Sequence, residues 1–148
     1  MPVAVVTRAV MAKPRFIPGF VWANLICTVQ ARRAPGFLNG TLALSPRGME
    51  FYTLTVWRDG RAMMSFRKSG SHDTFVPKLG DWGSEAASAI WKVADGRLPS
   101  WDQAHEALRT HARFIPVEAP NNNHRNGVIP QRSRVLVVLP LLRKRVID

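Results

Sequence analysis

Cysteine and acidic residues are scarce in this chain of 148 residues. The single cysteine, Cys27, excludes an intrachain disulfide and a cysteine-based metal site. Only 10 Asp and Glu stand against 21 Lys and Arg, so the formal net charge is +11. This excess either favours an anionic partner, such as nucleic acid, phospholipid or an acidic substrate, or belongs to a basic protein whose arginines are simply solvated. The basic residues are not interleaved with aromatics in a nucleic-acid motif, so no specific nucleic-acid partner is predicted.

Long apolar runs and the common catalytic signatures are also missing. The run 16–31 is broken by Pro18 and Asn24, and 135–142 is too short for a membrane span of about 20 residues. Basic residues interrupt the N-terminal stretch, so no signal peptide is predicted, and a reducing, cytoplasmic location is expected. There is no catalytic triad, glycine-rich phosphate loop or His-x-x-x-His pattern, which leaves hydrolase and kinase functions without support.

The strongest local pattern lies at 50–72. Residues 51–57 alternate as a β-strand. One face of this strand carries Phe51, Thr53, Thr55 and Trp57, and the other carries Tyr52, Leu54 and Val56. Asp59 then offers a side-chain oxygen as the N-cap of a short helix, which Gly70 ends by taking the left-handed conformation. His72 follows directly after this predicted helix end.

The other regular elements follow from apolar spacing and turn residues. Strands are predicted at 3–12, 37–44 and 86–94, helices at 17–33 and 100–110, and a further helical turn at 75–79. The helix at 17–33 is apolar on nearly every side, which predicts that it is covered on more than one side. Ser100 and Gln103 form a capping box at the start of the last helix.

The C-terminal part is less regular. A short strand is predicted at 114–117. Residues 120–127 have no apolar side chain to bury, which predicts a linker with a solvated His124. Residues 134–148 are apolar and then basic; they are either a strand added to a sheet edge, of this chain or of a partner, or an end without a structural role.

The order of the elements predicts an α+β fold of the ferredoxin-like βαββαβ type. A four-stranded antiparallel sheet would carry two helices on one face, with an extra C-terminal helix. Phe51, Trp57 and Trp91 are expected on the open face, where a second copy would cover them, so a homodimer is predicted. The chain divides into a domain at 1–118 and a basic linker and tail at 119–148.

A family resemblance rests on the same central segment. Strand 51–57, the helix after it and the sequence Phe66-Arg-Lys-Ser-Gly-Ser-His72 resemble the signature of the dimeric α/β-barrel superfamily. The closer resemblance is to its spheroidene-monooxygenase-like branch and related uncharacterised bacterial domains, where an element similar to 98–108 follows the fourth strand. The resemblance covers about residues 3–110. It implies a pocket between the sheet and the helices of each subunit, which some members use with haem and others without a cofactor.

His72 is the principal candidate for chemistry. An imidazole at a helix end can act as a base near neutral pH or bind a metal or haem iron; alternatively, it bonds a backbone carbonyl and only caps the helix. The resemblance to haem-degrading relatives puts their iron-binding His about one helical turn later, where this chain has Val76, so a ligand would have to be His72 itself. Asn24 is polar on an apolar helix and needs a partner, either a substrate carbonyl or a backbone group.

Aromatic side chains and one arginine complete the candidate pocket. The aromatic residues, which either line a pocket or form plain core, are Trp22, Trp57, Phe66, Trp82 and Trp91. Arg8, on the first strand, either neutralises an acidic substrate or is an ordinary exposed arginine. His105 and His111 are six residues apart on one helix and do not share a face, so no metal site is predicted.

We therefore expect a monooxygenase-like oxidoreductase whose hydrophobic pocket holds an aromatic or apolar small molecule. His72 would act as base or ligand and Asn24 as an orienting hydrogen bond, and haem is the one cofactor that the resemblance offers. The rival interpretation is a non-catalytic module that binds a small molecule or a partner. In that interpretation the basic tail contacts an anionic surface such as a membrane.

Overall fold

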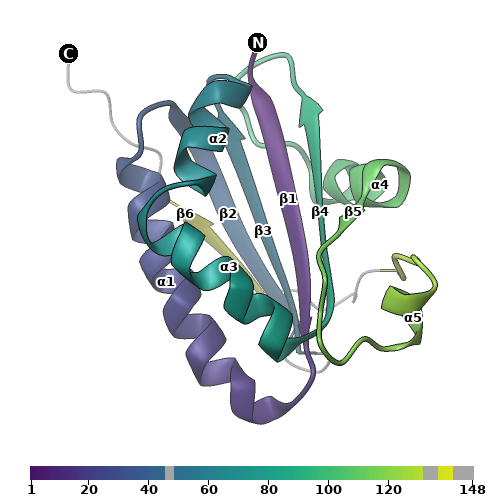
Figure 1. Ribbon diagram of the computed structural model, residues 1–148. Helices are drawn as coiled ribbons and strands as arrows, with labels where there is room; N and C mark the ends of the chain where they lie inside the picture. The colour runs from purple at the N-terminus through teal and green to yellow at the C-terminus, as the bar shows by residue number, and fades with distance from the viewer. Residues whose placement is uncertain (46–48, 132–136, 142–148) are drawn as a thin grey trace.

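A computed structural model describes residues 1–45, 49–131 and 137–141 (Figure 1). The strands are β1 (Val3–Met11), β2 (Phe37–Ser45), β3 (Glu50–Trp57), β4 (Gly83–Lys92), β5 (Arg113–Phe114) and β6 (Val137–Leu141). The helices are η1 (Pro14–Phe16), α1 (Ile17–Arg33), α2 (Gly60–Arg67), α3 (Gly70–Trp82), α4 (Trp101–His111) and α5 (Asn122–Arg125). The predicted ferredoxin-like α+β fold is confirmed, and α1 has the predicted bounds. Among the described residues, no helix is long and apolar enough to cross a bilayer.

The sheet is antiparallel throughout and has the strand order β5-β4-β1-β3-β2-β6. Its middle four strands are the four that the sequence predicts. The strand count was too low, because β5 and β6 extend the described sheet at its two edges. Residues 137–141 thus add a strand to the sheet of their own chain, next to β2. The rest of the predicted tail segment, 134–136 and 142–148, lies outside the described residues.

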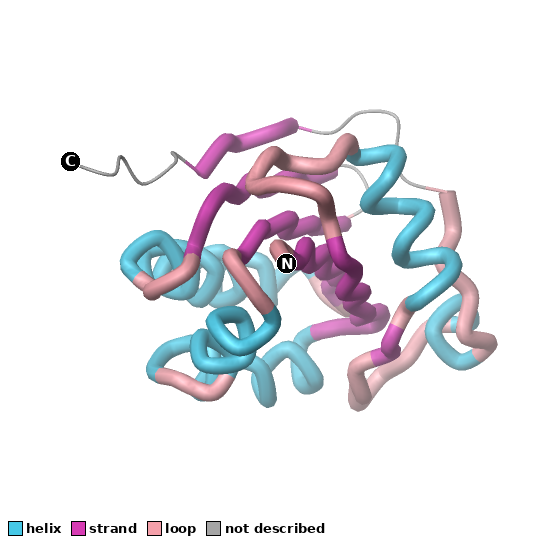
Figure 2. The backbone as a smooth tube through the Cα atoms, turned by 90° about the horizontal axis from the view of Figure 1, so that it is seen from above, coloured by secondary structure: helices cyan, strands magenta, loops and turns pink. Residues whose placement is uncertain are grey.

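Three helices, α1, α2 and α3, form a layer over one face of the sheet (Figure 2). This face carries Phe51 and Trp57 of β3. Trp57 is 1% exposed, and its ring lies 5.5 Å from the ring of Phe37 and 4.9 Å from that of Phe66. Phe51 packs against Phe20 of α1 with 4.7 Å between ring centroids. The face that was predicted to be open is therefore covered, because the helices after β1 and β3 both fold back over it.

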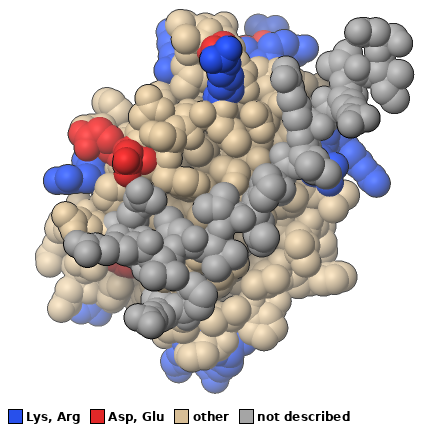
Figure 3. Space-filling view, turned by 180° about the vertical axis from the view of Figure 1, so that it is seen from behind, with Lys and Arg blue, Asp and Glu red and all other residues tan. Residues whose placement is uncertain are grey.

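The opposite face is covered by α4. Its capping box is formed as predicted, with the Ser100 hydroxyl accepting from the Gln103 amide at 3.1 Å. Ala104 and Leu108 of α4 are buried in a cluster with side chains of β1, β3 and β4, and the half-buried Trp91 packs against this cluster. Figure 3 shows the molecule from this side, with Lys and Arg gathered at the margins.

The prediction that Phe51, Trp57 and Trp91 share one open face is wrong. Trp91 pairs with Ala4, which pairs with Val56, so Trp91 and Val56 lie on the same face of the sheet. Trp57 follows Val56 in the strand and therefore points to the opposite face. These three aromatic residues therefore form no shared open face for a second copy to cover, and the homodimer stays a prediction.

Helix α3 is much longer than the single turn predicted at 75–79. Gly70 has a φ of +51°, as expected of a helix end, but the chain uses this left-handed residue to turn and begin α3 at once. Pro77 and Gly80 both lie inside α3, so neither ends the helix. A Cβ at Gly80 would lie 3.0 Å from the carbonyl oxygen of Pro116, which leaves little room for a larger residue there. Only a helical turn at 75–79 was predicted because Gly and Pro are helix breakers in isolation.

The predicted linker at 120–127 packs against the sheet. It contains the short helix α5, and the backbone amide of Asn121 donates to the carbonyl of Ser84 at 3.1 Å. His124 is not solvated as predicted: its Nδ1 accepts from the Ala86 amide at 3.3 Å, and its ring meets Phe114 edge-on at 5.4 Å. Polar side chains hold this segment by hydrogen bonds, which a count of apolar residues does not detect.

Candidate functional site

A cavity of about 170 Å³ lies between the sheet and helices α1, α2 and α3. Its floor is the β-sheet, and its walls are the inner sides of the three helices. Of the predicted site residues, it is lined by His72, Asn24, Trp57, Phe66 and Trp82. Cys27 also lies in its wall, where burial raises the pKa of the thiol and keeps it protonated.

His72 lies in the first turn of α3 and is half-buried. Its Nδ1 is 3.3 Å from the carbonyl oxygen of Arg67, so the Nδ1–H donates this hydrogen bond and Nε2 carries the lone pair. Burial lowers the pKa of the imidazole from its ordinary value, although the hydrogen bond to Arg67 opposes this shift. The ring is therefore neutral at pH 7 and has one basic nitrogen, which is what a general base requires.

Gln30 fixes the start of α3 relative to α1. Its amide nitrogen donates to the carbonyl and the hydroxyl of Ser69, at 2.8 and 3.0 Å. Its amide oxygen accepts from the backbone N–H of His72 at 3.1 Å. Gly70 has a positive φ, which favours glycine, and a Cβ there would lie 3.0 Å from the Gln30 nitrogen, so a larger residue would displace the Gln30 side chain. Gln30 thus positions the residue that carries the imidazole.

Gln30→Ala should lower the free energy of unfolding by about 1 kcal/mol, because it removes hydrogen bonds that hold the α3 N-terminus. Urea denaturation would measure the loss, and the imidazole NMR signals of His72 should shift. Gln30→Glu is the matched control, because it keeps the acceptor for the His72 amide but not the donor to Ser69. Its free energy of unfolding should lie between those of the wild type and Gln30→Ala. Unchanged His72 signals in Gln30→Ala would contradict this positioning role.

The cavity floor carries a row of hydroxyl groups that the sequence argument missed. Thr7 pairs with Thr53 on one side and with Ser88 on the other, so these three side chains lie side by side on β3, β1 and β4. All three line the cavity. Together with Asn24 on α1, they give an otherwise apolar site a polar edge on which a ligand oxygen can be held. The alternation of each strand was visible in the sequence, but the register that aligns the three strands was not.

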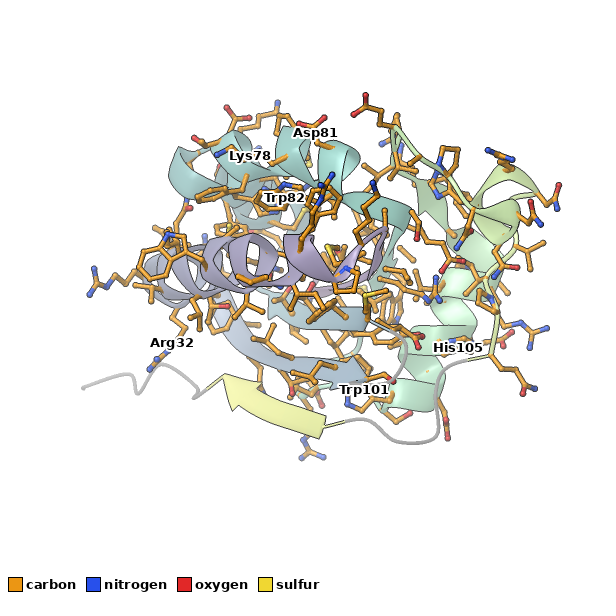
Figure 4. The ribbon with its side chains drawn as sticks, turned by 90° about the horizontal axis from the view of Figure 1, so that it is seen from below. Arg32, Lys78, Asp81, Trp82, Trp101 and His105 are labelled. Carbon is orange, nitrogen blue, oxygen red and sulfur yellow. The ribbon has the colours of Figure 1, made fainter. Side chains whose placement is uncertain are left out.

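Aromatic rings connect the sheet to His72. The Trp57 ring stacks on Phe66 with a 27° interplanar angle, and Phe66 contacts the His72 ring at 4.9 Å. The Trp57 indole N–H donates to the Thr55 hydroxyl at 3.0 Å. Trp82 lies between α3 and α1 (Figure 4), where a Cβ at Gly19 would be 3.3 Å from its ring.

Three predicted pocket residues lie outside this cavity. Trp22 is on the outer side of α1 and is 64% exposed. Trp91 packs on the α4 side of the sheet. Arg8 is on the same side as Trp91, because its cross-strand partner is Tyr52, and it is buried instead of exposed. In each case the residue type suited a pocket. The direction of the side chain, however, was set by the alternation of side chains along a strand or by the face of the helix on which the residue lies.

Arg8 is held by a buried ionic cluster. Its Nη1 is 3.0 Å from Glu85, and its Nε is 3.4 Å from Glu50 and 3.1 Å from the Tyr52 hydroxyl. Burial raises the pKa of Tyr52, so the phenol stays protonated and donates to Glu50. The Nε and Nη1 of the guanidinium are thus bonded to buried groups of the protein itself, and a role in neutralising a substrate is not supported by its position.

The cavity does not fit a haem. Its volume of about 170 Å³ is below the 300–1,000 Å³ typical of pockets for drug-sized ligands. A haem is at least as large as a drug-sized ligand and needs a larger pocket than this one. His72 keeps its Nε2 free while Nδ1 bonds a backbone carbonyl, as an axial ligand does, so the misfit with haem rests on the cavity volume and not on the imidazole. Within the described ranges, no three His, Cys, Asp or Glu residues are grouped so that they could hold a metal ion.

Comparison with solved structures shows the fold family. Rv0793 from Mycobacterium tuberculosis is 21% identical with a TM-score of 0.58, over 64% of this chain and 97% of that one. A putative antibiotic biosynthesis monooxygenase from Nitrosomonas europaea is 16% identical with a TM-score of 0.56, over 62% and 89%. SnoaB, a cofactor-independent oxygenase from Streptomyces nogalater, is 17% identical with a TM-score of 0.54, over 67% and 98%. These likenesses establish the fold and no reaction.

The resemblance implied a ferredoxin-like fold, and these neighbours share that fold with the chain. No curated protein matches the chain. A family model described as a domain of unknown function (DUF3291) matches residues 6–113, which is more than half of the sequence. The chain therefore belongs to the DUF3291 family.

Proposed function

We propose that this protein is a monooxygenase that oxidises a small aromatic or similarly apolar molecule in the cavity beneath α1, α2 and α3. One observation carries the proposal: a neutral, half-buried imidazole, with its Nδ1 fixed by a backbone carbonyl, lines an apolar cavity. The solved structures described as a monooxygenase and as a cofactor-independent oxygenase share the fold, which supports this chemistry without establishing it.

The size of the cavity limits the substrate. An apolar cavity of about 150 Å³ holds one benzene molecule. At about 170 Å³, this cavity fits a substrate with a single ring. The hydroxyl groups of Thr7, Thr53 and Ser88 and the amide of Asn24 would bond a phenol or carbonyl oxygen at the edge of that ring. The substrate class is therefore a single-ring molecule with an acidic O–H or C–H group and one polar edge.

His72 would start the reaction as a base. Its Nε2 removes a proton from the activated C–H or O–H group, and the resulting anion is electron-rich enough to reduce O₂. For a CH₂ group the balanced reaction forms C=O and one water from one O₂: one oxygen atom stays on the substrate carbon, the other leaves as water, and the substrate supplies all the electrons. The protein's contribution is to orient the ring, take the proton and exclude bulk water.

Oxygen consumption with a panel of single-ring hydroquinones and enols tests the proposal. His72→Ala should lower the rate by about 10²–10⁴-fold, which is the typical contribution of a general base. His111→Ala, at an exposed position at the end of α4, is the matched control and should retain the full rate. Binding of the same compounds without oxygen uptake would favour the non-catalytic binding module. An unchanged rate in His72→Ala would remove the base from the mechanism.

The pH dependence of stability should follow His72. Its pKa in the folded protein is lowered, so on acidification the unfolded chain takes up the proton first, near pH 6.5. The contribution of His72 to the free energy of unfolding is therefore complete above about pH 6.5 and declines as the pH falls through the lowered folded-state value. Urea denaturation from neutral to mildly acidic pH should show a shallower decline for His72→Gln than for the wild type. Equal slopes would contradict the lowered pKa.

A further inference from the structure

The outer face of α1 exposes a continuous row of apolar side chains. Trp22, Leu25 and Val29 are 64%, 52% and 47% exposed, and their spacing of three and four residues places them on one side of the helix. We call the outer face of α1 the side formed by Val21, Trp22, Leu25, Ile26 and Val29. The opposite side of the same helix, with Ala23, Asn24 and Cys27, lines the cavity. A helix that is apolar on both sides is expected to be covered on both sides, and the residues that the structure describes cover only the inner one.

A wide groove runs along this outer face to the C-terminal end of α1. It is lined by Trp22, Leu25, Ile26, Val29 and Arg33 of the helix and by Ser69 at the start of α3. Its walls are apolar along the helix, and the guanidinium of Arg33 stands at one end. The groove therefore joins an apolar surface to a positive charge.

The charged residues of α1 and of the segment before it are all basic. Residues 1–49 contain no Asp or Glu, so neither α1 nor the segment before it carries an acid. Lys13 and Arg15 precede the helix and are exposed, and Arg32 and Arg33 are exposed in its last turn. In Figure 4, Arg32 points away from α3 at the end of α1, whereas Lys78 and Asp81 project from the far side of α3.

This charge pattern disfavours a second copy of the chain as the occupant. A two-fold axis across the outer face would bring basic ends together, whether the two copies of α1 run parallel or antiparallel. Neither copy offers an acid within residues 1–49 to compensate. Like charges brought together at an interface are costly. An anionic partner with an apolar interior would complement both the basic residues at the ends of α1 and the apolar side chains between them.

We propose that the outer face of α1 binds an anionic lipid surface. Trp22 would sit at the level of the headgroups, where Trp is favoured, with Leu25 and Val29 reaching the acyl chains. The basic residues at both ends of the helix would contact lipid phosphates. The helix would lie in the plane of the interface, so the cavity on its inner side faces away from the lipid.

Vesicle flotation of the full chain tests this inference. The probes are vesicles of phosphatidylcholine mixed with phosphatidylglycerol and vesicles of phosphatidylcholine alone. Leu25→Ser/Val29→Ser should weaken binding to the mixed vesicles by at least about tenfold. Val128→Ser is the matched control, since Val128 has the same 47% exposure as Val29 but lies after α5, and it should bind like the wild type. Arg32→Gln/Arg33→Gln should lose roughly tenfold on mixed vesicles only.

Three outcomes would overturn the inference. The first is unchanged binding of Leu25→Ser/Val29→Ser, since other basic segments would then account for all of the attraction. The second is a dimer in gel filtration that this double variant dissociates, which would make a second copy the occupant. The third is retention of the wild type on an oligonucleotide but not on mixed vesicles. Circular dichroism melts of the variants should match the wild type, because every substituted side chain is exposed.

Discussion

Arg8→Met is expected to lower the free energy of unfolding by about 3–5 kcal/mol, the typical cost of removing one partner from a buried ionic group. Arg8 is 4% exposed and is the cation shared by Glu50 and Glu85, which are also buried. Methionine fills much of the same volume, so the loss would come mainly from two carboxylates left without a counter-charge. Urea denaturation at neutral pH would measure it.

Two further variants separate charge from packing at this cluster. Arg8→Met/Glu85→Gln should recover part of the stability lost in Arg8→Met, because one of the uncompensated carboxylates is removed. Arg97→Met should change the stability by less than about 1 kcal/mol, because the pair that Arg97 forms with Asp95 is exposed. If the double variant were no more stable than Arg8→Met, the loss would have to be assigned to packing.

Trp57→Ala should cost about 3–5 kcal/mol, as expected for truncation of a fully buried aromatic residue. Trp57 packs against both Phe37 and Phe66, and its N–H is satisfied by Thr55. Its removal would leave a void at the junction of β3 and α2. Since Phe66 also contacts His72, the substitution should disturb the His72 imidazole resonances in addition to the melting temperature.

Trp22→Ala is the matched control for Trp57→Ala. The two residues are of the same type and were both predicted to line the pocket, yet Trp22 is 64% exposed and Trp57 is 1% exposed. Trp22→Ala should therefore change the free energy of unfolding by no more than about 0.5 kcal/mol. A large loss in Trp22→Ala, or a small one in Trp57→Ala, would contradict the placement of these side chains.

Local signals in the sequence located most elements of the domain. The bounds of α1 were predicted because Pro14 and Pro35 enclose a long apolar stretch. The N-cap at Asp59 and the capping box at Ser100 were predicted because a side-chain oxygen satisfies backbone amides only two or three residues away. Helix α3 was missed because the local signals oppose it: its Gly and Pro residues are helix breakers. Its contacts with α1, which are distant in sequence, outweigh these signals.

The candidate site was only partly foreseen. His72, Asn24, Trp57, Phe66 and Trp82 do line one cavity, since they belong to β3 and to the helices that fold over it. Trp91 and Arg8 were assigned to the same pocket, but they project from the other side of the sheet. Thr7, Thr53 and Ser88 were not considered, because single hydroxyl residues on three strands acquire meaning only once the strands are in register.

The sequence by itself determined the four central strands, helix α1, the caps at Asp59 and Ser100 and the division of each strand into two sets of side chains, because these depend on interactions within a few residues. Only the tertiary structure decided which set faces the cavity and which faces α4. Alternation in a strand says that neighbours point to opposite sides, but not which side a distant helix will cover. That choice is made by long-range packing, and it places His72 over an apolar cavity and Arg8 in a buried ionic cluster.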